Sequence, residues 1–372
     1  MIVGVPKEIK NHEYRVGLTP DSVRELAAHE HRVTVETQAG AGIGCSDDDY
    51  RAAGAHIAAS AEEVFARAEL IVKVKEPQPA ERRMLHEGQL LFTYLHLAPD
   101  PEQGKDLVRS GAVCIAYETV TDGNGGLPLL APMSQVAGRM SIQAGAHCLE
   151  RAHGGKGILL GGVPGVPPAR VVVIGGGVVG ENAIHMALGM AAQVTVLDRN
   201  VDVLCRLARR FGPALTTVYS NKAALEECVL GADLVIGAVL VVGAGAPKLV
   251  TREMVRRMKP GSVLVDVAID QGGCFETSRP TTHAEPTFVV DGVVHYCVAN
   301  MPGAVPRTST YALNNVTLPY ALALADKGYQ AALLENPNFR LGLNVCRGAV
   351  THKAVAEHLR YEYVDPARAL RS

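Results

Sequence analysis

Residues 171–200 read VVVIGGGVVGENAIHMALGMAAQVTVLDRN, and this stretch decides the fold. The apolar residues at its start predict a buried strand, the glycines predict a tight turn, and the residues that follow suit a helix. A second apolar run then ends at Asp198. The order of strand, glycine turn, helix, strand and acid predicts a βαβ unit that binds a dinucleotide.

The three glycines of this turn have separate physical tasks. Gly175 permits the sharp bend after the strand, Gly177 lets the backbone approach a pyrophosphate, and Gly180 lets the helix pack against the strand. Asp198 follows at a spacing close to the roughly 20 residues at which an acid binds the ribose hydroxyls. Because an acid also repels a 2′-phosphate, we expect NAD rather than NADP. We interpret Arg199 as a surface residue, although it could meet such a phosphate.

The N-terminal third of the chain alternates apolar runs with segments that suit helices. Strands are expected at residues 3–5, 33–36, 70–74, 89–94 and 113–117. Helices are expected at residues 21–28 and 61–68. Alternation of this kind predicts an α/β domain with a parallel sheet.

The rest of the chain repeats this alternation after a helix expected at 133–151, which has Ser134 near its start. The Gly- and Pro-rich segment 154–168 predicts a hinge and boundary. Further strands are expected near residues 171–174, 216–219, 234–239, 263–267 and 294–298. Helices are expected at residues 201–211, 223–230, 251–258, 311–327 and 349–359. The pair Gly243 and Gly245 predicts a loop, because Pro247 and Lys248 follow where a phosphate turn would need a helix start.

Composition narrows the class of protein. The chain has 372 residues, 38 glycines and 48% hydrophobic residues, which is enough for two α/β domains. Its net charge of −2 and lack of a basic block give no reason to expect a nucleic acid or a membrane surface as a partner. With no signal-peptide pattern and no apolar run of membrane-spanning length, we expect a cytoplasmic protein.

The eight cysteines are scattered and form no CxxC pair, which predicts reduced thiols. Cys274, Cys297, His283 and His295 are close in sequence but lack the spacing of zinc ligands. We therefore expect no metal site.

Four polar residues are candidates for chemistry because each lies within, or at the end of, an apolar element. They are Arg15, Lys75, His96 and Asp270. The last three lie at or just past the carboxyl ends of expected parallel strands, where open α/β sheets place ligand sites. Arginine and lysine bind a carboxylate, histidine exchanges a proton near neutral pH, and aspartate accepts a proton or orients a water. Together with a nucleotide site, this set suits oxidation of a small acid that bears an amine or a hydroxyl.

The sequence resembles a known family, the bacterial L-alanine dehydrogenases. The resemblance spans residues 1–320 in order and is carried by seven segments: KEIKNHEYRVGLTP (7–20), KVKEP (73–77), LFTYLHLA (91–98), LPLLAPMSQVAGRMSIQAGA (127–146), GGVPGV (161–166), DVAIDQGGCFE (266–276) and YCVANMPGAVPRTSTYALNN (296–315). It implies reversible NAD-dependent oxidative deamination of L-alanine to pyruvate and ammonia, carried out by a homohexamer. It also implies two doubly wound domains, with a Rossmann NAD-binding domain at 129–306 inserted into a discontinuous catalytic domain at 1–128 and 307–372.

The resemblance also assigns residues by position. Arg15 and Lys75 match the substrate-binding residues of the family, and His96 and Asp270 match its catalytic pair. The positions that match its nucleotide contacts are Ser134, Gly175, Gly177, Val178, Val179, Gly180, Asp198, Arg199, Ser220, Val239, Leu240, Val267, Ala268, Ile269, Arg279, Val298, Ala299, Asn300 and Met301. We hypothesise that His96 moves protons at the reacting nitrogen or oxygen and that Asp270 activates the hydrolytic water. The sequence leaves the division of proton transfers between them open.

Departures from the family and rival interpretations remain. Val203 replaces a basic residue found near the adenosine in some members, and Ala323 and Lys327 replace a glutamate and a histidine that bind metal in some members. We therefore expect no magnesium there. The rivals are a transhydrogenase α-subunit, which needs a membrane partner, an opine- or saccharopine-type dehydrogenase, and a non-catalytic NAD-binding protein.

Overall fold

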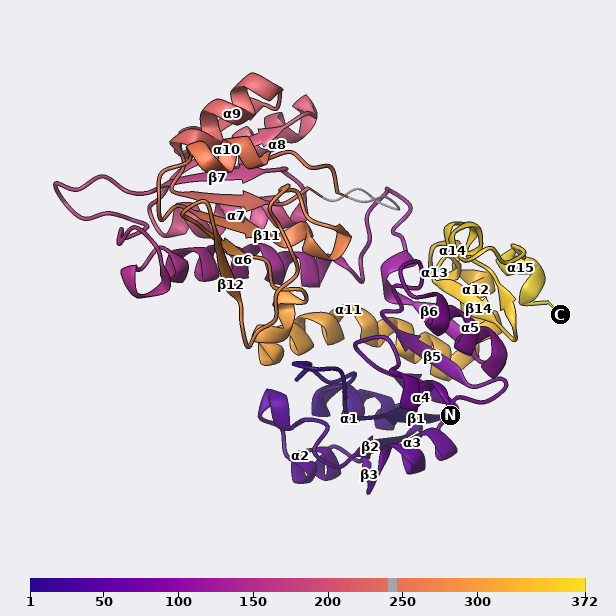
Figure 1. Ribbon diagram of the computed structural model, residues 1–372. Coiled ribbons are helices and arrows are strands. Elements are labelled where there is room, and N and C mark those ends of the chain that lie inside the picture. The colour runs from indigo at the N-terminus through magenta and orange to yellow at the C-terminus, as the bar shows by residue number, and fades with distance from the viewer. Residues whose placement is uncertain (240–245, 372) are drawn as a thin grey trace. The chain divides into compact units, whose positions relative to one another are not determined.

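The computed structural model describes residues 1–239 and 246–371, and the chain divides into two units (Figure 1). Met1–Met133 together with Val305–Ser372 form the first unit, which we call the enclosing domain. Ser134–Ala304 form the second unit, which we call the inserted domain. Both are α/β domains built on largely parallel sheets.

The enclosing domain has an eight-stranded sheet in the order β15-β14-β6-β5-β4-β1-β2-β3. Its strands are β1 (Ile2–Val5), β2 (Arg32–Glu36), β3 (His56–Ala58), β4 (Leu70–Val72), β5 (Leu90–Thr93), β6 (Val113–Ala116), β14 (Leu343–Cys346) and β15 (Ala349–Val350). The first six pair in parallel, and β14 and β15 extend the sheet in antiparallel fashion. Read from the edge, these six run 3-2-1-4-5-6, which is the doubly wound order of dinucleotide-binding folds.

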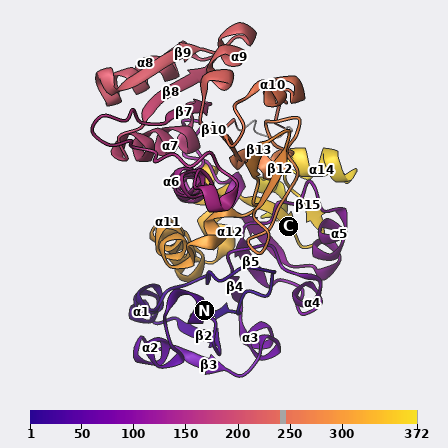
Figure 2. The ribbon, with the colours of Figure 1, turned by 60° about the vertical axis from the view of Figure 1, so that its left-hand side comes forward.

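Helices cover both faces of this sheet, as Figure 2 also shows. They are α1 (Pro20–Ala28), α2 (Asp47–Ala52), α3 (Ala61–Arg67), α4 (Pro79–Arg82), α5 (Pro101–Ser110), α11 (Pro306–Lys327), α12 (Tyr329–Glu335), α13 (Pro337–Arg340), α14 (Lys353–Leu359) and α15 (Pro366–Ala369). Short 3₁₀ helices occur at η1 (Ala41–Ile43) and η2 (Tyr117–Thr119). Helix α1 begins where it does because the side chain of Thr19 accepts the N–H of Ser22 and Pro20 occupies the first turn.

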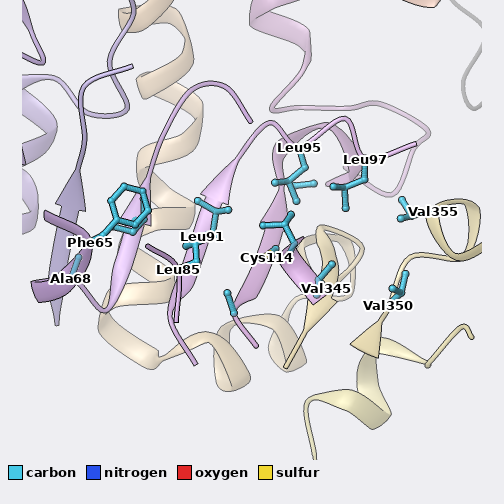
Figure 3. Packing of buried hydrophobic residues seen from close by; sticks show 14 of the residues in the cluster. Phe65, Ala68, Leu85, Leu91, Leu95, Leu97, Cys114, Val345, Val350 and Val355 are labelled. Carbon is cyan, nitrogen blue, oxygen red and sulfur yellow. The ribbon is translucent and has the colours of Figure 1, made fainter. Parts of the chain in front are cut away.

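Neighbouring residues of one strand serve opposite faces of the sheet. Leu91 joins a buried cluster with Phe65 of α3, Cys114 of β6 and Val355 of α14 (Figure 3). The next residue, Phe92, instead contacts Tyr117 and Phe339 on the other face, at ring centroid distances of 4.4 and 5.9 Å. Burial on both faces explains why these strands are continuous apolar runs rather than alternating ones.

The C-terminal tail corrects one expectation. Residues 349–359 do not form one helix, because Ala349–Val350 pair with β14 and the helix α14 starts only at Lys353. The turn between the strands is Arg347-Gly348, and both residues have positive φ (47° and 87°), as a two-residue hairpin requires. The β-branched Val350 and Thr351 fit a strand better than a helix start.

The inserted domain has a seven-stranded sheet in the order β12-β13-β11-β10-β7-β8-β9. Its strands are β7 (Arg170–Ile174), β8 (Gln193–Asp198), β9 (Leu215–Tyr219), β10 (Leu234–Gly237), β11 (Val263–Asp266), β12 (Thr287–Val290) and β13 (Val293–Tyr296). Without the antiparallel edge strand β12, the order is again 3-2-1-4-5-6. Strand β12 was not expected from the sequence.

Helices also cover both faces of the second sheet (Figure 1). They are α6 (Ala131–Cys148), which crosses the boundary between the units, α7 (Val178–Gly189), α8 (Val201–Phe211), α9 (Lys222–Gly231) and α10 (Arg252–Arg257), with 3₁₀ helices η3 (Arg151–His153), η4 (Gly212–Ala214), η5 (Val267–Gln271) and η6 (Met301–Ala304). Leu225 of α9 and Met254 of α10 pack on one face with Val172 and Leu264. On the other face, a Cβ on Gly145 of α6 would meet Leu234 at 2.7 Å, so the helix lies very close to the sheet.

Two further expectations need correction. The segment 154–168 is not a boundary, because it lies inside the inserted domain and is tied to it by the bonds Gly157 N to Leu149 O and Ala169 N to Leu160 O. Helix α6 begins at Ala131, so Ser134 lies within its first turn and does not cap it. The loop expected at Gly243 and Gly245 lies outside the described residues, and so does Leu240.

Two predictions about the whole chain can also be compared with the structure. All eight cysteines are free thiols, as expected from their spacing. Within residues 1–239 and 246–371, no helix is both long and apolar enough to cross a membrane.

Candidate active site

The glycine turn after β7 has the shape of an anion-binding cradle. Gly175 has φ +100°, and a Cβ there would lie 2.7 Å from the carbonyl oxygen of Ala238. A Cβ on Gly180 would lie 1.8 Å from the carbonyl oxygen of Gly175, so this helix start tolerates only glycine. Nothing lies within 4 Å of a Cβ on Gly177, which caps α7 without a side-chain bond. The N-terminal amides of α7 are thus left for an anion to approach closely.

Asp198 ends β8 beside this turn and is half-buried. Its Oδ2 accepts the N–H of Gly176 at 2.7 Å, and its Oδ1 accepts the N–H of Asn200 at 2.8 Å. Arg199 is exposed at the next position. The carboxylate is therefore fixed against the glycine turn, where an acid that binds ribose hydroxyls belongs.

The other expected nucleotide contacts that the structure describes lie in the inserted domain. Most of them follow the carboxyl ends of strands: Val178 and Val179 after β7, Ser220 after β9, Val239 after β10, Val267, Ala268 and Ile269 after β11, and Val298, Ala299, Asn300 and Met301 after β13. Ser134 lies at the start of α6, and the guanidinium of Arg279 stacks on Phe288 at 4.3 Å. Because parallel strands end at one edge of a sheet, the structure gathers most of these residues along that edge.

Asp270 is exposed in η5, four residues after β11 ends. The loop that carries it is built around Asp266, which is fully buried and accepts the N–H of Cys274 at 2.9 Å and the hydroxyl of Ser278 at 2.5 Å. Burial raises the pKa of Asp266, although these hydrogen bonds oppose the shift. Lys248 also binds the loop, by donating to the carbonyl oxygen of Phe275 at 3.2 Å. Asp270 is therefore presented by a well-anchored loop.

In the enclosing domain, Arg15 is buried and held by Glu13. Its Nε and Nη2 donate to the two carboxylate oxygens of Glu13, both at 2.6 Å, and its Nη1 lies 3.1 Å from the sulfur of Met133. Burial alone would lower the pKa of Arg15, but the bonds and charge of Glu13 outweigh it and raise that pKa. The bidentate pair fixes the guanidinium plane and balances its charge.

Two lysines follow β4 in different surroundings. Lys73 is fully buried, and its Nζ lies 3.0 Å from an oxygen of Glu8 and 2.6 Å from an oxygen of Glu81. Burial raises the pKa of Glu8, and the charge of Lys73 opposes this shift. Burial alone would lower the pKa of Lys73, but the two carboxylates reverse the effect and raise it. Lys73 is thus an internal anchor between β1 and β4.

Lys75, two residues further along, is half-buried. Its N–H donates to Glu8 at 3.3 Å, and its carbonyl accepts the hydroxyl of Thr93 at 2.9 Å. Burial would raise the pKa of Glu76, but the charges of Lys75 and Lys10 lower it. The backbone on both sides of Lys75 is therefore fixed by the strand ends beside it.

His96 lies three residues past β5, and its side chain is 42% exposed. Its φ of +48° is uncommon for a residue with a side chain. Glu118 supports this turn by accepting the N–H of His96 at 2.6 Å and that of Leu95 at 3.2 Å, and its carboxylate lies 3.9 Å from His96 Nδ1. Tyr94 stacks on the imidazole with ring centroids 5.7 Å apart.

The structure thus places Lys75 and His96 past neighbouring strand ends of the enclosing sheet, and Asp270 past a strand end of the inserted sheet, as predicted. The sequence reasoning missed the carboxylates and the lysine that support these residues: Glu8, Glu13, Lys73, Glu118 and Asp266. A signal existed for Lys73, which interrupts the apolar run LIVKV, and for Asp266, which interrupts LVDVAI. Neither position reveals its partners in sequence.

The chain matches two domain models of one protein family. Residues 4–137 match the model described as "Alanine dehydrogenase/PNT, N-terminal domain", and residues 141–353 match the corresponding C-terminal domain. The chain belongs to this alanine dehydrogenase/PNT family. It is accordingly an oxidoreductase with a nucleotide-binding domain.

Relatives in the family match over almost the whole chain. The alanine dehydrogenase of Halomonas elongata is 64% identical over 99% of both chains, and that of Bacillus subtilis is 56% identical over 100% of this chain and 98% of its own. A solved L-alanine dehydrogenase has a TM-score of 0.94 at 54% identity, covering 97% of this chain and 99% of its own. A solved transhydrogenase from Sinorhizobium meliloti has a TM-score of 0.81 at 25% identity, covering 95% and 100%. The chain is thus more similar to these alanine dehydrogenases than to this transhydrogenase.

Proposed function

We propose that the protein catalyses the reversible NAD-dependent oxidative deamination of L-alanine to pyruvate and ammonia. The observation that carries the proposal is the gathering of Lys75 and His96 at one edge of the enclosing sheet. It gains weight because the chain is 54% identical, over nearly its full length, to a solved L-alanine dehydrogenase. A carboxylate-binding cation beside a proton carrier suits a small amino acid.

The cofactor of this proposal is NAD, and the residues of the inserted domain fit it. The cradle of Gly175, Gly177 and Gly180 has room for a pyrophosphate, and Asp198 would accept hydrogen bonds from the ribose hydroxyls. Bound NAD would accept the hydride that leaves the substrate. The negative charge of Asp198 would disfavour the additional phosphate of NADP.

The substrate carboxylate is the anion that Lys75 and Arg15 would bind. Glu13 already binds the guanidinium of Arg15 through both carboxylate oxygens and balances its charge. Arg15 instead offers a guanidinium in a fixed orientation, which helps to position the substrate. We therefore expect substrate affinity and turnover to depend most strongly on Lys75.

The chain's own residues would carry the proton transfers. When hydride leaves the α-carbon of alanine, the lone pair of the amine nitrogen forms the C=N bond of an imine. A water then adds to this carbon and loses one proton to a base. The nitrogen takes up a proton, the C–N bond breaks as the hydroxyl loses its remaining proton to form the C=O bond of pyruvate, and ammonia leaves. We propose that His96 exchanges protons with the nitrogen and oxygen of the substrate and that Asp270 accepts the proton of the attacking water. The same residues would act in reverse during amination of pyruvate.

The test is the formation of NADH from L-alanine and NAD by the purified protein. Lys75→Ala should abolish measurable turnover while NADH binding stays within a few-fold of the parent, and Lys105→Ala, an exposed lysine on α5, serves as a matched control. Asp270→Asn should depress both directions and retain NADH affinity. Activity with an opine and none with alanine would contradict the proposed substrate. Activity that requires NADPH would contradict the proposed cofactor.

The family resemblance further supports a homohexamer and a cytoplasmic location as parts of this proposal. Sedimentation of the purified protein tests the first, and fractionation of cells that produce it tests the second. A monomer with full activity would contradict the hexamer without affecting the proposed reaction.

A further inference from the structure

The end of α6 carries three side chains with metal-binding groups at a spacing of three residues. His147, Glu150 and His153 form the pattern HxxExxH, and all three are exposed. One ligand atom from each lies within 4.8 Å of the others. In the part of the chain that the structure describes, no other group of three histidine, cysteine, aspartate or glutamate side chains is so close together.

The backbone fixes these three residues relative to one another. The N–H of Glu150 donates to the carbonyl of His147 at 3.1 Å, and the N–H of His153 donates to the carbonyl of Glu150 at 3.1 Å. Two successive bonds thus join the three residues directly. The turn from α6 into η3 therefore fixes the backbone positions from which the three side chains extend.

The same turn is anchored to the interior of the inserted domain. Cys148 and Leu149, between the first two ligand residues, are buried. The N–H of Gly155 donates to the carbonyl of Glu150 at 3.1 Å, and Lys156 bonds to Gly261 through its N–H and to Asp233 through its Nζ. A metal bound here would find its ligands on a rigid turn rather than on a loose end.

The distances suit a small divalent ion. Nδ1 of His147 lies 3.5 Å from one oxygen of Glu150, and Nε2 of His153 lies 3.6 Å from the other. Metal–ligand bonds of about 2.0–2.1 Å at tetrahedral angles separate ligand atoms by roughly 3.3 Å. The two imidazole rings lie side by side, with centroids 3.8 Å apart. One ligand atom from each of the three residues lies within 4.8 Å of the others, which is not far above the separation expected of ligand atoms on one ion.

We propose that His147, Glu150 and His153 form a binding site for a divalent late transition metal ion, with Zn²⁺ as the most suitable. Two imidazole nitrogens and one carboxylate oxygen are ligands that zinc, cobalt and nickel accept, whereas magnesium and calcium prefer oxygen alone. Water completes the coordination because all three side chains face solvent. The site departs from the expectation of no metal, and it is independent of the proposed dehydrogenase activity.

A bound ion would clamp the last turn of α6 to η3. Because the unfolded chain does not hold the three groups together, the ion binds the folded protein more tightly and raises its unfolding temperature. The stabilisation would be local to this helix end. We assign the site no catalytic step.

The experiment is calorimetric titration of the chelator-treated full-length protein with Zn²⁺, together with visible spectra of the Co²⁺ form. We expect one Zn²⁺ per chain and a cobalt spectrum typical of nitrogen and oxygen ligands. His147→Asn and His153→Asn should each weaken Zn²⁺ binding by about tenfold or more, and the double variant should abolish it. Glu150→Gln should also weaken binding.

His185→Asn is the matched control, since this histidine is also exposed on a helix of the inserted domain. It should leave the stoichiometry unchanged, and all variants should retain dehydrogenase activity, which shows that they fold. Absence of binding to the parent protein overturns the proposal. Unaltered Zn²⁺ binding and cobalt spectra in the double variant also overturn it, because the ion then binds elsewhere.

Discussion

The two domains share one strand order but leave their first strand through different chemistry. In the enclosing domain the chain leaves β1 through Pro6, Lys7 and Glu8, and Glu8 pairs with the buried Lys73. In the inserted domain it leaves β7 through a run of glycines that leads directly into α7. At the point where the strand order reverses, the enclosing domain therefore has buried charges, whereas the inserted domain exposes backbone amides.

This difference shows that the topology provides a place and the side chains decide its ligand. A doubly wound sheet leaves a crevice where the strand order reverses, whatever the sequence. Backbone amides at a helix start suit a diffuse anion such as a pyrophosphate, whereas cations on anchored strand ends suit a compact carboxylate. The following predictions test this division, from the largest expected effect to the smallest.

Lys73→Met should unfold the enclosing domain most readily, because it leaves Glu8 and Glu81 buried without a cation. We expect a loss of about 3–5 kcal/mol in the free energy of unfolding. Lys75→Met should change stability by less than about 1 kcal/mol, since the side chain is half-buried, yet abolish turnover. Denaturant unfolding of both variants makes the comparison, and equal stability of the two would show that Lys73 is no anchor.

Asp198→Ala should narrow the cofactor preference of the inserted domain. We expect the parent to prefer NAD over NADP by about 100-fold in kcat/KM, or about 2.7 kcal/mol. The variant loses both the hydrogen bonds to the ribose and the repulsion of a 2′-phosphate. Steady-state kinetics with both cofactors measure the change. Equal use of the two cofactors by the parent would mean that Arg199 outweighs Asp198.

Two glycines of one turn should respond differently to the same added methyl group. Gly180→Ala places a Cβ against the carbonyl of Gly175 and should cost about 1–3 kcal/mol of stability as α7 shifts. Gly177→Ala meets no protein atom within 4 Å, so it should leave stability intact and weaken only the binding of NADH. Thermal unfolding and NADH titration separate the two effects. Parental NADH affinity in the Gly177→Ala protein would show that the pyrophosphate does not bind beside Gly177.

Glu118→Gln tests the support of the enclosing domain's proton carrier. The amide can still accept the N–H groups of Leu95 and His96, but it loses the negative charge 3.9 Å from Nδ1. An amide oxygen accepts these N–H groups less strongly than a carboxylate does, so the turn that positions His96 should be held less firmly, with about a tenfold loss in kcat/KM. Glu118→Ala should lower the rate further because the turn at His96 loses its acceptor. Parental kcat/KM in both variants would show that Glu118 does not position His96.

The smallest expected effect contrasts two aspartates whose pKa values shift in opposite directions. In the inserted domain, burial raises the pKa of Asp266, so its contribution to stability is present at low pH and is lost as the pH rises through the folded-state pKa. In the enclosing domain, the hydrogen bond from His31 and the charge of His29 lower the pKa of Asp326. Its contribution is present above the unfolded-state pKa and is lost as the pH falls through the folded-state value.

Unfolding temperatures of Asp266→Asn and Asp326→Asn between about pH 2 and pH 7 check these signs, since the change expected for Asp326 lies below its unfolded-state pKa of about 3.9. The deficit of Asp266→Asn relative to the parent should shrink as the pH rises, and that of Asp326→Asn should grow. Since Asp326 is more than a third exposed, its effect should stay under about 1 kcal/mol. If the stability deficits of the two variants changed with pH in the same direction, the opposite pKa shifts of Asp266 and Asp326 would be contradicted.

Much of the fold could be predicted from the sequence because its parallel strands are buried on both faces. The apolar runs of β5, β7 and β11 stop at Thr93, Gly175 and Asp266, so the ends of these strands can be read from the sequence. Strand β12 was not predicted, although Asp291-Gly292, which joins it to β13, is a hairpin signal that could have indicated it. The hairpin at Arg347-Gly348 gives no such signal in the sequence, because arginine rarely adopts positive φ.

The reactive residues of the candidate site could be predicted from the sequence, but the residues that hold them in place could not. The turn that begins at Gly175 carries a local pattern, and Lys75 and His96 stand out within apolar segments. Glu118 supports His96 from a distance of 22 residues, and Glu8 meets Lys73 across 65 residues. Such pairs depend on the sheet order, which brings β1 beside β4 and β5 beside β6. Only the folded structure reveals them.

The antiparallel strands β14 and β15 have a consequence for synthesis on the ribosome. Strand β14 pairs with β6, yet the whole inserted domain is translated between them. All strands of the inserted sheet have therefore emerged before the enclosing sheet can gain its last two, and domains that are complete fold as units during translation. Until Leu343–Cys346 emerge, β6 is an unpaired edge on a nascent chain, where chaperones are most needed.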